Sequence, residues 1–504
     1  MSNHLSRRRF LQRAAVSGAA LAVANLLAAC SSSSTPTAAP AATVKPTTAA
    51  AATTAPAAAT APAAAATSAP SGSASAGAAT TPAGSAPTVS GSTTTAASAV
   101  TTTKVSGTVD YWSRETFDNG ARQPLIQQRL AAFDKANGTT SKAQFMVFQE
   151  SVQKTQAALA ANTVPDLGEQ GPDVTLGFAA AGNLLPIDDI FNGLKDQFVP
   201  LQKDAFVTYN GNAFGVPWYT ETRVLFYHKD LLDAAGVKPP TNWQEWAAAA
   251  KALTKGEEQY GFAFPPDGAL AGQIFVPLAV AAGGNLLDKD GKVNGDTPEF
   301  KAALQFLSDL YTGGSMPKAL PTYKQNDTDQ LFALKKIAMY WTNGSILTTL
   351  KTQAPDVLKT LGAVKTPPRD ASGTSRSFLG GFQLFVFKQG KNTAGGKELL
   401  KYLFDPTWYA DYVQKTNGAA LPVTKAVAAK DTYQSDPILK TLIEQQQTAV
   451  RYGGTAYGNA PFLGEAEGKL LFSQPVIDVF TGKQSVDSAV ATMNTEVKKL
   501  AKQA

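Results

Sequence analysis

The sequence predicts an α/β protein of two lobes, in which each lobe holds a mainly parallel sheet flanked by helices. Short runs typical of strands alternate with runs of helical periodicity, which is the pattern of strands joined by helices. Residues 105–504 are also too many for one small hydrophobic core, so we expect lobes of roughly 150 to 250 residues each.

The N-terminus has the features of an export signal. Arg7 and Arg8 precede an apolar run from about Ala14, which ends at Leu27-Ala28-Ala29-Cys30. A positive start, an apolar centre and small residues before the cut are typical of a cleavable signal rather than a membrane span. The arginine pair resembles the twin-arginine export address, and residues 27–30 resemble the bacterial lipobox. We therefore expect residues 1–30 to be a signal peptide and Cys30 to carry lipid. Cys30 is the only cysteine, so no disulfide can form within the chain.

Residues 31–104 are nearly all Ala, Thr, Ser, Pro and Gly. Such a segment buries too little apolar surface to offset its ordering entropy, and we expect a disordered tether. The formal net charge of +6 comes entirely from residues 1–104, which hold six basic residues and no acidic residue. Residues 105–504 are thus neutral overall and have no polybasic stripe, so nucleic acid is not an expected partner. The six charges are those of Arg7, Arg8, Arg9, Arg13, Lys45 and Lys104.

Periodicity places several elements within the two lobes. We expect strands at 107–112 and 144–148 and helices over 125–133 and 151–161. Thr241 is expected to cap a helix, because prolines precede it and Gln244 follows three residues later. Pro298 is well placed to open another helix. Asp290-Gly291 is expected to turn two short strands.

The sequence offers little material for catalysis. Its two histidines are His4, in the expected signal, and His228, so histidine-based triads and the usual zinc sites are excluded. Ser151 and Lys154 match a serine–lysine motif whose companion motifs are missing. Asp288, Asp290 and Glu299 fit positions of a calcium loop, but Val293 stands where that loop needs glycine. We predict no enzyme, no cofactor and no metal.

Aromatic, amide and charged side chains instead gather near expected strand ends and turns. In open α/β sheets ligands bind beyond the carboxyl ends of strands. Flat rings stack on the apolar faces of sugars, while carboxylates, amides and arginine pair with hydroxyl groups. The alternative is that each tryptophan belongs to the core.

Several segments, taken in order, resemble the extracellular solute-binding proteins of ABC importers, in the group that includes maltose-binding proteins. The most recognisable segment runs from Tyr209 through Trp218 to Trp243. Further segments are 179–189, 338–344 and 480–483, and the resemblance spans residues 107–500.

This resemblance implies a type II-like periplasmic-binding-protein fold with a hinge of crossing segments. One lobe would hold residues 105–221 and 372–433, and the other residues 222–371 and 434–504. Carried over by motif, the candidates for ligand contact are Trp112, Arg114, Glu115, Glu169, Gln170, Trp218, Tyr219, Glu221, Trp341, Asn343, Gly344, Gly381 and Phe382.

The resemblance also implies a function. We expect a lipid-anchored monomer on the outer face of the bacterial cytoplasmic membrane that captures a carbohydrate, a mono- or oligosaccharide, by hinge closure and delivers it to an ABC permease. The alternatives are another solute, such as a polyol, a peptide or a phosphorylated compound, although no glycine-rich phosphate cradle stands out. A further alternative is a secreted glycoside hydrolase that would use two carboxylates among Glu115, Glu169 and Glu221.

Overall fold

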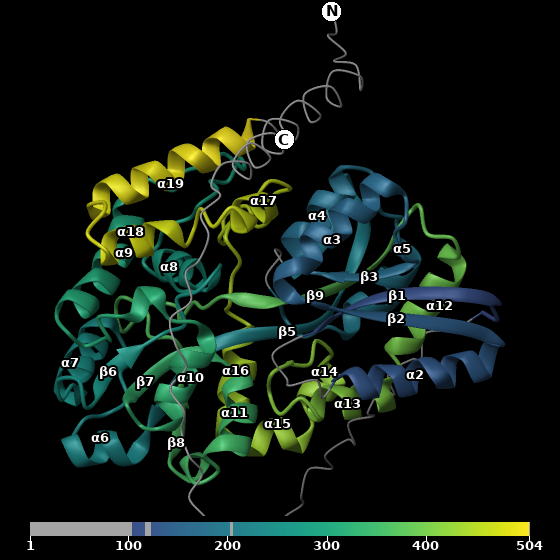
Figure 1. Cartoon of the computed structure of the whole chain (residues 1–504). Coiled ribbons are helices and arrows are strands. Elements are labelled where there is room, and N and C mark those ends of the chain that lie inside the picture. Colours follow the sequence, from purple (N-terminus) through teal and green to yellow (C-terminus); the bar gives the residue numbers. More distant parts are fainter. Residues whose placement is uncertain (1–102, 116–121, 202–204, 503–504) are drawn as a thin grey trace, which may run out of the picture. The chain divides into compact units, whose positions relative to one another are not determined.

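One long strand, β5 (Asn212–His228), organises the sheet of this computed structural model (Figure 1). The structure describes residues 103–115, 122–201 and 205–502. The expected export signal with Arg7 and Arg8, the lipid site at Cys30 and almost all of the tether lie outside these residues.

Strand β5 joins two groups of strands because it changes partner along its length. It pairs with β9 from Val216 to Thr222, and with β7 from Arg223 onward. We call the strands on the β9 side the first half-sheet and those on the β7 side the second half-sheet. The full order is β2-β1-β3-β9-β5-β7-β6, with β4 and β8 also paired to β5. The remaining strands are β1 (Gly107–Glu115), β2 (Thr139–Val147), β3 (Leu167–Gln170), β4 (Val207–Tyr209), β6 (Tyr260–Ala263), β7 (Ile337–Asn343), β8 (Leu361–Val364) and β9 (Leu379–Val386).

The α/β class is confirmed, but the sheet is mixed rather than mainly parallel. Pairs β1–β2, β1–β3 and β6–β7 are parallel, as expected from helical connections. Strand β5 runs antiparallel to β9, β7 and β8, and β3 runs antiparallel to β9. The alternation of strands and helices in the sequence could not reveal the antiparallel pairs of β9. Strand β9 pairs with β3 and β5 only after the chain has formed most of the second half-sheet.

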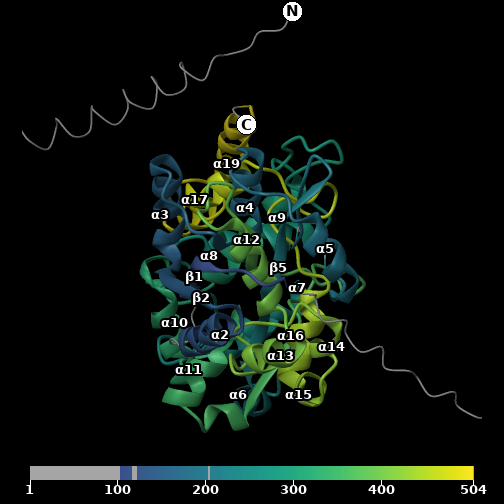
Figure 2. The same cartoon turned by 90° about the vertical axis from the view of Figure 1, so that its right-hand side faces the viewer.

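Helices cover both half-sheets (Figures 1 and 2). The first half-sheet is contacted by α2 (Arg122–Asn137), α3 (Phe148–Ala161), α4 (Pro172–Ala180), α5 (Asp188–Leu194) and α12 (Thr393–Leu403). The second is contacted by α6 (Lys229–Ala235), α7 (Trp243–Leu253), α10 (Gln325–Ala333) and α16 (Pro437–Gln446). The other α-helices are α8 (Leu270–Ala281), α9 (Pro298–Thr312), α11 (Ser345–Gln353), α13 (Pro406–Gln414), α14 (Lys425–Ala428), α15 (Asp431–Ser435), α17 (Leu463–Gly468), α18 (Gln474–Phe480) and α19 (Val486–Ala501).

Several expected boundaries change in the structure. Strand β1 extends to Glu115, β2 begins at Thr139, and residues after Pro165 form a strand, β3. Helix α9 begins at Pro298 as predicted. The cap of α7 is Asn242, not Thr241, because the Asn242 side chain accepts a hydrogen bond from the amide of Glu245. Around Asp290-Gly291 the two short strands that we expected do not form. A single β-bridge joins Leu287 and Val293 instead.

A large apolar core runs through both half-sheets. Val224, Leu225 and Phe226 of β5 are fully buried, and Trp246 of α7 packs edge-to-face on Phe262 of β6. No helix among the described residues is both long enough and apolar enough to span a membrane.

One carboxylic acid, Asp329 of α10, is buried in this core. It accepts a 2.7 Å hydrogen bond from the hydroxyl of Tyr340 on β7, and Tyr340 also bonds to Thr328. Burial, with a smaller contribution from Asp267, raises the pKa of Asp329 to about 7. The protonated acid is therefore favoured in the folded protein.

We predict that Asp329 makes stability fall as the pH rises from about 4 to about 7. Its folded pKa lies above its unfolded pKa, so its stabilising contribution is complete below the unfolded pKa and is lost through the folded pKa. The variant Asp329→Asn keeps the acceptor for Tyr340 and should be more stable than the wild type at pH 8 by about 4 kcal/mol, but not at pH 4. Denaturant titrations at both values test this, with exposed Asp370→Asn as control.

Candidate functional site

The register of β5 and β9 brings several candidate residues together where β5 changes partner. Tyr219 lies opposite Phe382, and Thr220 opposite Gly381, while Arg223 lies opposite Asn343 of β7. Gly381 has φ +116°, and a Cβ there would lie 2.3 Å from the carbonyl oxygen of Tyr219. Only glycine allows β9 to approach β5 this closely.

Arg114 and Gln170 meet beside Phe382. The Arg114 guanidinium donates to Gln170 and to Ser151 of α3, and it lies 4.8 Å from the centre of the Phe382 ring. Burial lowers the pKa of Arg114 to about 10, so the side chain stays charged at neutral pH. The side chain of Glu115, the last residue of β1, lies outside what the structure describes.

Glu169 is the centre of a buried network within the first half-sheet. Its carboxylate accepts from Tyr111 (2.9 Å), Ser113 (3.0 Å) and Tyr219 (3.0 Å), and it forms a 3.2 Å ion pair with Arg122 of α2. Arg122 also donates to the hydroxyl of Tyr219 at 2.7 Å. The structure thus gives Glu169 a supporting role, and its contact with solute stays a prediction.

Three tryptophans among the candidates pack against protein. Trp218 is 0% exposed and stacks on Tyr412, with ring centres 5.0 Å apart. Trp341 is 1% exposed, and its indole N–H donates to Thr366. Trp112 is half-buried against the cluster around Phe385. In this conformation Trp218 and Trp341 belong to the core, which was the alternative interpretation of the tryptophans. Stacking of solute on any of the three stays a prediction.

Glu221 and Asn343 are linked at the change of partner. The Asn343 amide donates to Glu221, which also forms a 3.2 Å ion pair with Arg223. Gly344 follows β7, and a Cβ there would lie 2.0 Å from the carbonyl oxygen of Gly418, so the two backbones touch.

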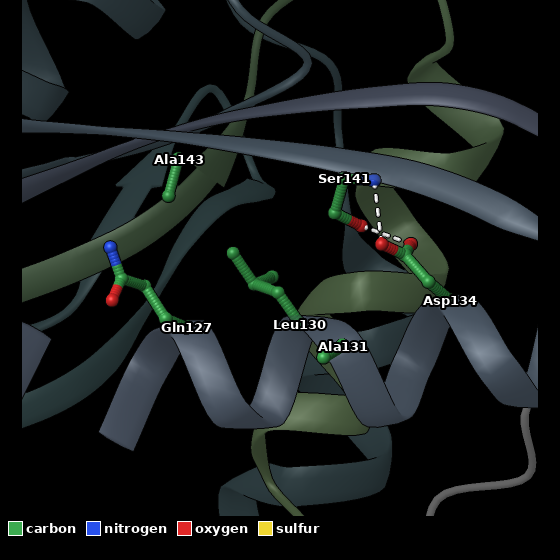
Figure 3. A pocket seen from close by; sticks show the side chains of 6 residues that line it. All are labelled: Gln127, Leu130, Ala131, Asp134, Ser141 and Ala143. Carbon is green, nitrogen blue, oxygen red and sulfur yellow. Dashed lines mark hydrogen bonds between the residues drawn. The ribbon is translucent and has the colours of Figure 1, made fainter. Parts of the chain in front are cut away.

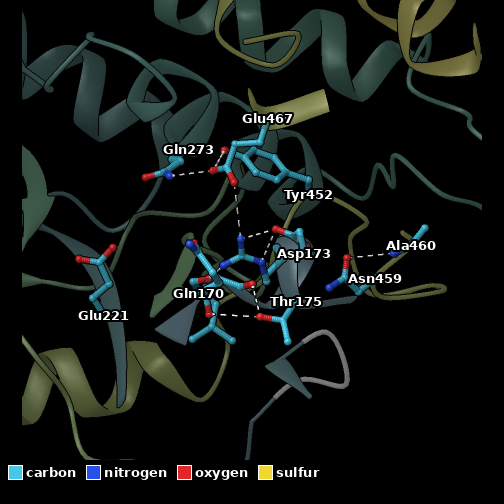
Figure 4. A network of polar contacts seen from close by, with 12 residues as sticks. Gln170, Asp173, Thr175, Glu221, Gln273, Tyr452, Asn459, Ala460 and Glu467 are labelled. Carbon is cyan, nitrogen blue, oxygen red and sulfur yellow. Dashed lines mark hydrogen bonds and ion pairs between the residues drawn. The ribbon is translucent and has the colours of Figure 1, made fainter. Parts of the chain in front are cut away.

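A second network was missed by the sequence analysis (Figure 4). Arg451 donates to Asp173 of α4 through Nε at 2.7 Å, and to the carbonyl oxygen of Leu379 through Nη1 at 2.7 Å. Glu467 of α17 lies 3.9 Å from Arg451 and accepts from Tyr452 and Gln273. No local motif signals this network, because 278 positions separate Arg451 from Asp173.

Charges in this region balance. The Glu169, Glu221 and Arg451 networks each contain both signs, and with Arg114 the side chains described above are four arginines and four carboxylates. They are Arg114, Arg122, Arg223 and Arg451, with Glu169, Asp173, Glu221 and Glu467.

A pocket of about 290 Å³ lies elsewhere, between α2 and β2 (Figure 3). Two of its polar residues already bond to each other, since Asp134 accepts from the amide and hydroxyl of Ser141. None of the candidate residues lines it. Within the described ranges no three His, Cys, Asp or Glu side chains are placed to hold a metal ion.

Comparison with known proteins decides the family. The model of the bacterial extracellular solute-binding proteins matches residues 128–441. The chain belongs to this family. As a solute-binding protein of the ABC-transporter type it acts outside the cytoplasm and is not an enzyme, which removes the glycoside hydrolase alternative.

Individual relatives and structures agree with this assignment. The solute-binding protein is 26% identical over 400 residues to YcjN of Escherichia coli (strain K12), named as a periplasmic-binding protein of an ABC transporter, and the match covers 76% of this chain and 90% of YcjN. It is 29% identical over 284 residues to the diacetylchitobiose-binding protein DasA of Streptomyces coelicolor, covering 53% and 62%. The structure of maltose-bound MalE3 of T. maritima matches with a TM-score of 0.67 at 23% identity, over 78% of this chain and 100% of MalE3, and confirms the periplasmic-binding-protein fold.

We predict that Glu169→Gln destabilises the solute-binding protein by about 3 to 5 kcal/mol, because Arg122 then stays buried without its carboxylate. Thermal and denaturant unfolding measure the loss. The matched variant Glu444→Gln, on the exposed side of α16, should change stability by less than about 0.5 kcal/mol. Equal stabilities of the two variants would refute the supporting role of Glu169.

Proposed function

We propose that this protein captures a neutral sugar or polyol for an ABC importer. The observation that carries the proposal is the balance of four arginines with four carboxylates among the described side chains around the change of partner in β5, a set that does not include Glu115. A phosphate or carboxylate solute would need an excess of positive charge there, whereas hydroxyl groups pair with either sign.

Three further polar atoms favour a hydroxyl-rich solute. Asp173 Oδ1, Gln273 Oε1 and Asn459 Nδ2 are buried and have no hydrogen-bond partner among the described residues. Two of them accept and one donates, and a hydroxyl group can satisfy either kind. Figure 4 places all three side chains in the region of the Arg451 network.

The relatives support the same class of solute. DasA is named for diacetylchitobiose, and a further relative from Halalkalibacterium halodurans, 25% identical over 231 residues, is named for arabinooligosaccharides. UgpB of Shigella dysenteriae, 24% identical over 427 residues, is named for sn-glycerol-3-phosphate. The charge balance favours the first two as guides over UgpB.

The candidate residues take part in this proposal in different ways. Arg114, Gln170, Glu221, Asn343 and Phe382 are proposed to contact solute, as are Tyr219, Trp112, Glu115, Gly344 and Gly381. Like most of these side chains, Glu169, Trp218 and Trp341 are buried among protein groups in this structure, so solute is proposed to reach them when the two lobes move apart. The lobes are proposed to be residues 105–221 with 372–433 and residues 222–371 with 434–504.

Thermal shift tests the proposed solute. We predict that the chain from residue 31 onward melts a few degrees higher with one neutral sugar or polyol, since a solute at a hundred times its Kd adds about 2.7 kcal/mol. Asn459→Ala should weaken binding about fivefold by removing one hydrogen bond, while exposed Asn294→Ala should not. A shift with sn-glycerol-3-phosphate or peptides alone, or none at all, would contradict the proposal.

We also propose that lipid on Cys30 anchors the protein to the outer face of the cytoplasmic membrane, after export directed by Arg7 and Arg8. The tether would then keep the binding protein, a monomer, close to its permease by raising the effective concentration. Two acyl chains on one residue are enough for stable anchoring.

This proposal predicts that Cys30→Ser releases the protein from the membrane. Fractionation of cells that produce each form should move the variant from the membrane pellet to the soluble fraction. Ser31→Ala is the matched control and should stay in the pellet. A variant that sediments like the wild type would rule out anchoring through Cys30.

A further inference from the structure

Arg451 is contacted by acids from two different parts of the molecule. Asp173 stands in the first turn of α4, which packs on strands β4, β5 and β9. Glu467 belongs to α17 and is tied to α8 by Gln273. We propose that the Asp173–Arg451–Glu467 bridge holds the two proposed lobes together before solute binds. This inference rests on the hinge movement that belongs to the proposed function.

The geometry of the bridge is unequal. Arg451 contacts Asp173 through both Nε and Nη2, while Glu467 is 3.9 Å from Nη2. The side chains of Arg451 and Asp173 are only 4% and 1% exposed. Charge-assisted bonds in such a place are strong, and every contact joins protein groups, so solute is not needed to form them.

Close backbone packing accompanies the ion pair. A Cβ at Gly464 of α17 would lie 3.0 Å from the carbonyl carbon of Asp173, and one at Gly177 of α4 would lie 3.4 Å from the carbonyl oxygen of Pro461. Separation of α4 from residues 461–468 therefore breaks a tight contact and exposes the ion pair at the same time.

Loss of the Asp173 charge should reverse this preference. In Asp173→Asn the buried guanidinium of Arg451 loses the carboxylate that it contacts most closely, while Glu467 lies 3.9 Å away. An uncompensated buried charge is costly, and opening of the halves would return it to water. The variant is thus expected to favour the open form.

Distances between spin labels test the bridge in the full chain without any solute. Cys30→Ser removes the only native thiol, and labels are attached at Ala181→Cys, just after α4, and at Thr495→Cys on α19, both exposed positions. The parent should show one short distance, and Asp173→Asn an added longer one. Asp230→Asn, which removes the partner of Lys335 within the second half, is the matched control and should resemble the parent.

A second variant leaves the charges intact. Gly464→Ala crowds the backbone at Asp173 and should also add the longer distance. This variant decides the question if Asp173→Asn does not fold by circular dichroism. If Asp173→Asn folds and shows the same distances as the parent, the proposed bridge is refuted. If Asp173→Asn does not fold, the same result for folded Gly464→Ala refutes it. The spin-label experiment contains no solute, so its outcome does not depend on which solute binds. A failure of sugar binding in the thermal-shift experiment would therefore count against the proposed function and not against the bridge.

Discussion

Strand β5 is the constraint on which the rest of the structure depends. Its hydrogen bonds pass from β9 to β7 without a break in the strand, so one backbone segment belongs to both half-sheets. Side chains alternate along a strand, which puts Tyr219, Glu221 and Arg223 on one face. The positions of these three side chains are therefore set by strand register, whereas Arg451 and Asn459 lie in the loop before α17.

Buried charge is the second theme of the molecule. Arginine and carboxylate side chains are almost never fully buried unless they are paired. Here the pairs connect elements that are distant in sequence: α2 with β3 through Arg122 and Glu169, and α4 with the segment before α17 through Asp173 and Arg451. Removal of one member costs more than the pair contributes, because the other stays desolvated. Such pairs specify which elements meet.

Sequence patterns predicted some features and not others for physical reasons. Pro298 marked the start of α9 because proline fits the first turn of a helix. The C-terminal end of β1 at Glu115 and the strand character of Glu169 and Gln170 were missed. A buried four-residue strand such as β3 has no periodicity to detect. Trp218 was ambiguous because the same ring suits a core and a sugar. The Arg451 network depends on tertiary contacts, to which local patterns are blind.

The two half-sheets are joined by more than one backbone segment. Beside β5 runs β9, and the amide of Leu379 donates to Val450 while the amide of Val450 donates to Ser377. These three segments form a hydrogen-bonded ribbon at the junction. Sliding of the segments past one another would break these bonds in a row, whereas bending spreads small changes over many dihedral angles. The junction should consequently resist sliding and twisting but allow bending. Any relative movement of the half-sheets is then restricted to a narrow set of directions.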